Sequence, residues 1–159
     1  MATVHGHILW IVVAGSHRNV GKSTVGEFLR KNLTGAFFVK VGGGVENPGK
    51  AALLLPLDVS LQDVQARIPP GTRVVILESG RLASQVAPKV LLFCSDPEGE
   101  DKPEASPLRE EADLVAYGSV SCPQALQLAQ RMGLPPRKMG SLLNLLQVKV
   151  KGCQLGLFP

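Results

Sequence analysis

The residues best suited to chemistry lie in the stretch AGSHRNVGKST, from Ala14 to Thr24. It directly follows the apolar run ILWIVVAG and combines glycines, a lysine and hydroxyl side chains. Where a glycine-rich turn joins a strand to a helix, several backbone N–H groups point at one place, and the helix dipole makes that place attractive to an anion. The stretch therefore predicts a phosphate-binding loop. The alternative is that GKS is only a junction between a loop and a helix.

Each residue type in this loop has a part in holding a magnesium nucleotide. Gly21 leaves space for a phosphate beside the backbone. Lys22 reaches the outer phosphates, and the Ser23 hydroxyl completes the Mg²⁺ shell. We therefore expect Mg²⁺ and either ATP or GTP as ligands. The predicted nucleotide-binding residues are Gly15, Ser16, His17, Arg18, Asn19, Val20, Gly21, Lys22, Ser23 and Thr24.

A magnesium nucleotide also needs a carboxylate near the metal, usually at the end of a neighbouring apolar strand. The run VVILESG supplies Glu78 at such a place. We expect Lys22 and Glu78 to be the catalytic residues. Ser23 and Glu78 are the expected metal-binding residues, with Glu78 acting through water. The alternative is that Glu78 is simply solvated at a strand end.

Other parts of the nucleotide site stay open in the sequence. The guanine-specific motif NKxD is absent, so neither ATP nor GTP is selected. Lys102 and Asp113 are candidates for contacting a base or ribose, with an ordinary charged loop as the alternative. Glu46 and Asp58 are the candidates for orienting an attacking water. Because neither is clearly placed for that task, we expect slow or partner-dependent hydrolysis.

The spacing of the glycines places the loop in a particular class. Five residues separate Gly15 from Gly21, where the standard pattern has four. In this the loop resembles that of dethiobiotin synthetase and the cobyrinate amidating enzymes. The resemblance implies a basic residue inside the loop that reaches the nucleotide of a partner subunit. His17 and Arg18 occupy that region, with solvated loop side chains as the alternative.

A wider resemblance covers roughly residues 8–118. In order and spacing this part is similar to the molybdopterin-guanine dinucleotide biosynthesis accessory proteins, a family of small P-loop NTPases. The resemblance implies an accessory role in the biosynthesis of a molybdopterin dinucleotide-like cofactor. The chain departs from the family after Lys40, where VGGGVENPGK replaces a segment rich in His and Asp. The aligned positions are Lys40, Glu78, Gly80, Pro88 and Lys89.

The pattern of apolar runs predicts an α/β fold of the P-loop NTPase type, with a doubly wound, mostly parallel sheet. A helical spacing of apolar residues follows the loop, and a capping pattern at Ser60 and Asp63 predicts a second helix. We expect helices at 23–33 and 60–68, and strands at 8–15, 36–41, 88–95 and 112–119, with one more strand ending at Glu78. The acidic, proline-rich segment 95–107 is expected to be a mobile loop.

The last part of the chain differs in charge. Residues 1–118 form the predicted nucleotide-binding domain, and 119–159 a basic C-terminal region without acidic residues. Helices at 123–132 and 134–146, followed by a strand at 147–152, match a small helix-turn-helix-like appendage. Three roles remain open for this region: DNA binding, protein docking and a plain structural role. Its basic residues are Arg131, Arg137, Lys138, Lys149 and Lys151.

The composition is that of a globular protein and argues against a transmembrane protein and a zinc-binding protein. The chain has 159 residues, of which 45% are hydrophobic and 19% charged, which is ordinary for a globular fold. No apolar run approaches the ~20 residues that a transmembrane helix needs, so we expect a cytoplasmic protein without a membrane partner. Cys94, Cys122 and Cys153 are too widely spaced for a zinc site, and we expect reduced thiols, with a metal or redox contact at Cys153 as the alternative.

Three functions remain as hypotheses. The first is a magnesium-nucleotide binding protein with weak NTPase activity that assists cofactor biosynthesis, with a protein partner or a homodimer. The second is a nucleotide-gated regulator whose C-terminal region binds DNA. The third is an ATP-dependent kinase or ligase of the dethiobiotin synthetase type, for which no substrate-binding groups are evident.

Overall fold

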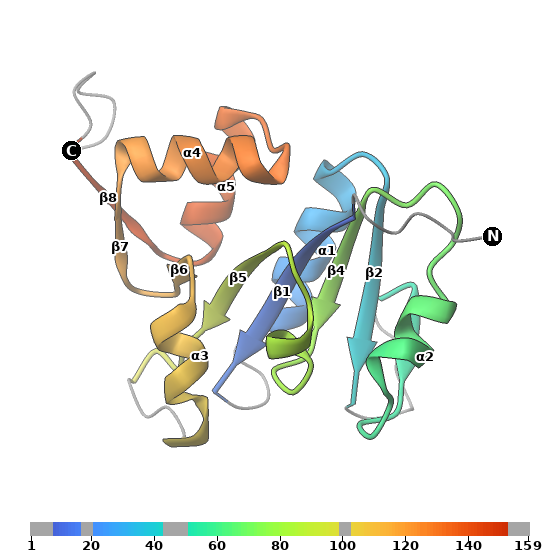
Figure 1. Ribbon diagram of the computed structural model, residues 1–159. Helices are drawn as coiled ribbons and strands as arrows, with labels where there is room; N and C mark the ends of the chain where they lie inside the picture. Colours follow the sequence, from blue (N-terminus) through green and yellow to red (C-terminus); the bar gives the residue numbers. More distant parts are fainter. Residues whose placement is uncertain (1–7, 17–20, 43–50, 99–102, 153–159) are drawn as a thin grey trace.

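The computed structural model describes residues 8–16, 21–42, 51–98 and 103–152 (Figure 1). His17, Arg18, Asn19, Val20, Glu46, Lys102 and Cys153 lie outside the described residues. The main element is a six-stranded sheet with the order β3-β2-β4-β1-β5-β6, in which every pairing is parallel. Its strands are β1 (Leu9–Gly15), β2 (Ala36–Val41), β3 (Leu53–Leu55), β4 (Val74–Glu78), β5 (Lys89–Cys94) and β6 (Leu114–Val115).

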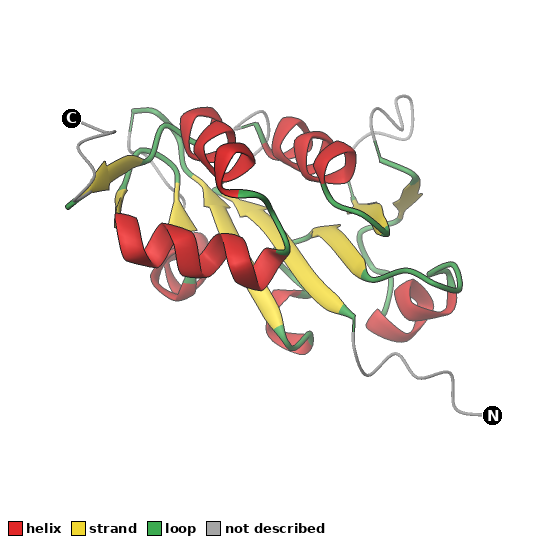
Figure 2. Cartoon of the chain, turned by 90° about the horizontal axis from the view of Figure 1, so that it is seen from above, coloured by secondary structure: helices red, strands yellow, loops and turns green. Residues whose placement is uncertain are grey.

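Helices cover both faces of this sheet (Figure 2). One face packs against α1 (Lys22–Asn32), α4 (Cys122–Met132) and α5 (Pro136–Leu145). The other face packs against α2 (Leu61–Ala66), the 3₁₀ turn η1 (Ala83–Gln85) and α3 (Ser106–Glu111), which follows a second 3₁₀ turn, η2 (Pro103–Ala105). The predicted α/β class with a parallel sheet between helices is therefore confirmed.

Alternation along the central strand explains why both faces are covered. Ile11 and Val13 on β1 belong to the cluster under α1, and Trp10, Val12 and Ala14 belong to the cluster on the opposite face. Successive side chains of a strand point to opposite faces, so an uninterrupted apolar strand must be buried on both. All five of these residues are at most 5% exposed.

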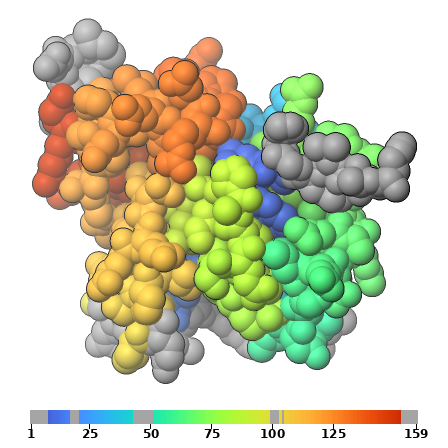
Figure 3. Space-filling model, viewed as in Figure 1, coloured from blue at the N-terminus to red at the C-terminus, as the bar shows by residue number. Residues whose placement is uncertain are grey.

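The C-terminal region continues the same hydrophobic core. It comprises β7 (Ser119–Ser121), α4, α5 and β8 (Lys149–Lys151), and β7 and β8 pair in parallel as a separate two-stranded sheet. Leu128, Met132 and Leu142 lie in one buried cluster with Ile11 and Leu29. In the space-filling view the orange C-terminal helices adjoin the yellow-green part of the chain without a break (Figure 3). Residues on both sides of position 118 therefore contribute to one core.

Most predicted elements form with small shifts at their ends. A Ser60 cap begins α2, where the hydroxyl accepts a hydrogen bond from the Asp63 N–H at 3.1 Å. Gly133 ends α4 in the left-handed conformation with a φ of 74°. The expected strand 147–152 forms as β8, although its parallel partner β7 makes it part of a crossover unit and not of a hairpin.

Three features differ from the expectations. The short strand β3 was not predicted, and residues 103–111, partly expected to be a loop, form η2 and α3. The expected strand 112–119 is interrupted after β6, because Tyr117 takes a φ of 65° and Gly118 donates a turn hydrogen bond to the Val115 carbonyl at 2.9 Å. Among the described residues, no helix has the length and apolar character needed to cross a bilayer.

One close approach in the core generates a stability prediction. Gly26 lies buried on α1, and a Cβ at this position would overlap the ring of Phe38. Gly140 on α5 has open space around the same hypothetical atom. We predict that Gly26→Ala lowers the free energy of unfolding by about 1–3 kcal/mol through overpacking. Gly140→Ala is the matched control and raises it by about 0.5–1 kcal/mol, because alanine is the better helix former.

Chemical denaturation of both variants and the parent measures the two changes. A Gly26→Ala protein at least as stable as the parent would contradict the packing of α1 against β2 described above.

Candidate functional site

The described residues of the predicted phosphate loop and Glu78 lie at the carboxyl edge of the parallel sheet. β1 lies between β4 and β5, with Val13 opposite Glu78 and Gly15 opposite Cys94. On the next strand, Lys40 of β2 lies opposite Glu78. Ligands of open parallel sheets bind outside this edge. The topology therefore brings the loop after β1 to the same edge as the ends of β4 and β5.

The start of α1 has the features of an anion-binding helix terminus. Gly21 precedes the helix with a φ of 91°, a left-handed conformation that disfavours other residues. Among the described residues no side chain caps the helix, and its first turn contains no acidic residue. The first N–H groups of a helix have no intrahelical acceptor. Apart from its chain neighbours, no described residue has an atom within 4 Å of a Cβ built on Gly21, so the described part of the chain leaves this space open.

Three side chains from three elements meet directly behind this terminus. The Ser23 hydroxyl donates a hydrogen bond to Glu78 Oε1 at 2.9 Å. Lys40 Nζ donates to Ser23 Oγ at 3.2 Å and lies 3.6 Å from Glu78 Oε2. Glu78 is 5% exposed, and among the described residues it is the one acidic side chain that is buried. The carboxylate is thus held by one hydroxyl and one ammonium group.

Lys40 was not among the predicted site residues. The resemblance aligned it, but gave it no role. The available signal is its place in AFFVKV, where it is the charged residue of an otherwise apolar strand. A lysine with only 27% of its side chain exposed needs a compensating charge. Glu78 supplies that charge from the adjacent strand.

The donor set fits a magnesium ion that is also bound by phosphates. A hydroxyl and a carboxylate are hard oxygen ligands, and Mg²⁺ commonly uses one or two protein ligands together with phosphates and water. Among the described residues no group of three or more His, Cys, Asp or Glu side chains forms a metal cage. Coordination through Ser23 Oγ would replace the hydrogen bond that this oxygen accepts from Lys40.

Two buried hydroxyls at the same edge have no hydrogen-bond partner among the described residues. Ser16 follows β1 and Ser95 follows β5, and each is 4% exposed with an Oγ that makes no hydrogen bond. The Ser16 N–H donates to the Cys94 carbonyl at 3.3 Å, which holds the two strand ends together. Leaving a buried polar group unsatisfied costs about 1–3 kcal/mol. These hydroxyls are therefore available to a ligand bound at the loop.

The electrostatics around Cys94 place the same groups close together. Burial raises the pKa of the Cys94 thiol to about 12, while Lys22 lowers this pKa and Glu78 raises it. Because the thiolate is the reactive form, Cys94 stays protonated and unreactive near neutral pH. This agrees with the expectation of a structural thiol.

The remaining predicted residues are placed as follows. Asp58 is exposed beyond β3. Asp113 accepts a hydrogen bond from the Leu91 N–H at 2.8 Å and one from Arg131 Nη1 at 3.3 Å. These contacts join β5 to α4, so Asp113 has a structural use that its charge alone did not reveal.

The contact between Lys40 and Glu78 predicts a measurable coupling. Lys40→Met should lower the free energy of unfolding by about 1–3 kcal/mol, because it leaves a buried carboxylate without its ammonium partner. In a protein that already carries Glu78→Gln, the same change should cost much less. Denaturation of the parent, both single variants and the double variant gives the coupling energy.

The predicted coupling energy exceeds about 1 kcal/mol. Additive effects of the two substitutions would show that Lys40 does not serve as the counter-ion of Glu78.

Comparison with models of known protein families, with curated proteins and with solved structures finds no match to this chain. What the site does is therefore argued from its own residues.

Proposed function

We propose that the chain is a P-loop protein that binds a magnesium nucleotide, ATP or GTP, at the carboxyl edge of its sheet and hydrolyses it slowly. The observation that carries this proposal is the hydrogen bond between Ser23 in the first turn of α1 and Glu78 at the end of β4. A hydroxyl one residue after a lysine, paired with a buried carboxylate on a neighbouring strand, is what a magnesium-phosphate site requires.

Each group has a stated part in binding. The N–H groups at the start of α1 and the Lys22 ammonium bind the phosphates, with Gly15 and Gly21 allowing the backbone to approach them. Ser23 and Glu78 hold Mg²⁺, Glu78 through water. The bound ion would neutralise charge on the phosphates and fix their orientation. In this proposal the Ser16 and Ser95 hydroxyls, which have no partner among the described residues, donate to the bound ligand.

We expect slow hydrolysis because no acidic side chain of the described residues is clearly placed to accept a proton from an attacking water. Glu78 is engaged by Ser23 and Lys40 and is not free to accept a proton from water. Asp58 is exposed beyond β3, and Glu46 is outside the described residues. A site that binds phosphates without a well-placed group to orient water hydrolyses slowly unless a partner supplies one.

The biological setting in this proposal rests on resemblance alone. The similarity of residues 8–118 to molybdopterin-guanine dinucleotide biosynthesis accessory proteins suggests that the nucleotide state regulates an assembly partner, or a second copy of the chain reached by His17 or Arg18. A kinase or ligase of the dethiobiotin synthetase type is the less supported alternative, because no acceptor-binding groups are evident in the sequence.

Lys22→Ala tests the proposal. It should weaken the binding of ATP or GTP by about 100-fold, because a charge-assisted contact with phosphate is worth up to about 3 kcal/mol. Calorimetric titration in Mg²⁺ measures this change and shows which base is preferred. Since Lys22 is only partly buried, the fold should be retained.

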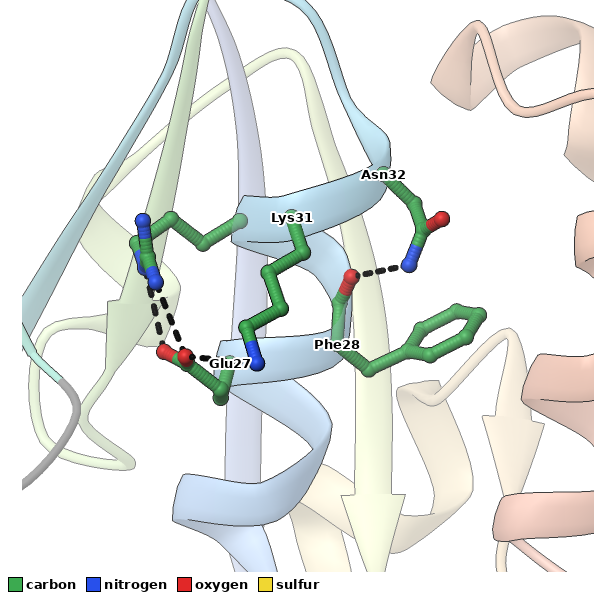
Figure 4. Close-up of polar contacts among 5 residues, drawn as sticks. Glu27, Phe28, Lys31 and Asn32 are labelled. Carbon is green, nitrogen blue, oxygen red and sulfur yellow. Dashed lines mark hydrogen bonds and ion pairs between the residues drawn. The ribbon is translucent and has the colours of Figure 1, made fainter.

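Lys31→Ala on the same helix is the matched control. Lys31 lies 3.4 Å from Glu27, which also accepts two hydrogen bonds from Arg30 (Figure 4). Arg30 lowers the pKa of Glu27 mainly through these hydrogen bonds. Removing Lys31 therefore leaves Glu27 paired and should leave nucleotide affinity unchanged. Equal affinity for nucleotide in the parent and in Lys22→Ala would refute the site.

A further inference from the structure

The second helix of the C-terminal region has one buried face and one polar face. Residues 133–135 separate α4 from α5, and most apolar side chains of both helices lie in the core, while Leu126 and Leu145 are exposed. On the other side of α5, Arg137, Ser141 and Asn144 are exposed at a spacing of three or four residues, and Lys138 is exposed beside them. Such positions lie on one side of a helix. The solvent face of α5 is therefore a mostly polar strip that begins in its first turn and ends beside the exposed Leu145.

A hollow of about 410 Å³ lies between this strip and β8. Gly140, Leu143 and Asn144 line it from α5, and residues 148–151, which alternate valine and lysine, line it from β8 and the residue before it. Among the described residues, no atom beyond the backbone of α5 itself lies within 4 Å of a Cβ built on Gly140, so the hollow is open beside this position. The two lysines point to the same side of β8, because alternate residues of a strand share a face. Val150 between them packs against the core.

The charge around the hollow has one sign. Residues 119–152 contain five basic residues and no acidic one. Arg131 is engaged in intramolecular hydrogen bonds, which its guanidinium donates to the Asp113 carboxylate and to the Lys89 carbonyl. The other four, Arg137, Lys138, Lys149 and Lys151, are exposed, and no ion pair joins them to an acidic side chain of the described residues. Such a surface attracts a polyanion.

We propose that α5 and β8 form a binding surface for duplex DNA, beyond the nucleotide site proposed above. Lysines on the rim suit phosphate contacts, which position a protein on the duplex. Arginine and asparagine are side chains that read base edges in the major groove. Arg137 lies in the first turn of the second of two helices, which is where a recognition helix meets base edges, and Asn144 lies in the last turn of the same helix.

The composition of this surface favours a duplex over a single strand. Binding of single strands relies on several aromatic side chains that stack on successive bases. Residues 119–152 contain no Phe, Tyr or Trp, and beside them the single exposed aromatic of the described residues is Tyr117, whose N–H bonds to the Leu146 carbonyl. A rigid helix with polar side chains on one face suits a groove of defined width. The partner is therefore double-stranded and is held mainly through its phosphates.

Fluorescence anisotropy with a labelled 20-base-pair duplex tests the proposal. We expect binding at low salt that weakens steeply as salt rises, because counterions are released from the phosphates. Arg137→Glu on α5 and Lys151→Glu on β8 should each weaken binding by about tenfold or more. Both positions are exposed, so the substitutions leave the core intact.

Arg67→Glu is the matched control. Arg67 is an exposed cation at the end of α2, on the opposite face of the sheet, and its reversal changes the net charge by the same amount. It should change the affinity for duplex DNA less than about twofold. The proposal is overturned by an absence of duplex binding at low salt, by equal losses in the control, or by tighter binding of the single strand. Titration of nucleotide tests the other site independently.

Discussion

The parallel pairing of β1 with β4 on one side and β5 on the other is the constraint on which the rest of the structure depends. It buries β1 on both faces, so helices must cover both. It also brings the ends of three strands to one edge, where the chain leaving β1 turns into α1. Glu78 and the first turn of α1 are 55 residues apart in sequence and in hydrogen-bond contact only because of this pairing.

At that edge the chain supplies its own cation. Lys40 lies against the carboxylate that is proposed to serve Mg²⁺, and donates to the hydroxyl oxygen proposed as a metal ligand. A buried carboxylate is costly without a positive partner. Lys40 therefore stabilises the fold through this contact, and binding of the proposed metal would have to rearrange it. This arrangement links the stability of the edge to the ligand that it is proposed to hold.

The sequence predicted the parts of the fold that have strong periodicity. The apolar runs of β1, β2, β4 and β5 and the helical spacing of α1, α4 and α5 are signals of that kind. The three residues of β3 give too short a pattern, and α3 lies next to an acidic, proline-rich segment that resembles a loop. The strand after α3 stops early because Tyr117 turns the chain.

The candidate site likewise has residues that the sequence predicts and residues that only the fold reveals. Gly21, Lys22 and Ser23 belong to a local motif, and Glu78 ends an apolar strand, so sequence alone suggests their chemistry. Lys40 and the unpartnered Ser16 and Ser95 hydroxyls gain their meaning from pairing between distant strands. The charge of the last part of the chain suggested a separate appendage, yet its apolar residues share one core with the sheet. Charge describes a surface, and only packing shows which residues share a core.

The most direct measurement of the central claim is the perturbation of backbone amide resonances when a magnesium nucleotide is added to the labelled protein. The account predicts the largest shifts at Gly21, Ser23 and Glu78, with smaller shifts at Ser16 and Ser95, and much weaker changes when Mg²⁺ is removed by a chelator. Resonances along α5 and β8 should stay in place. Unchanged amides at the start of α1, or largest shifts at another part of the fold, would contradict the account.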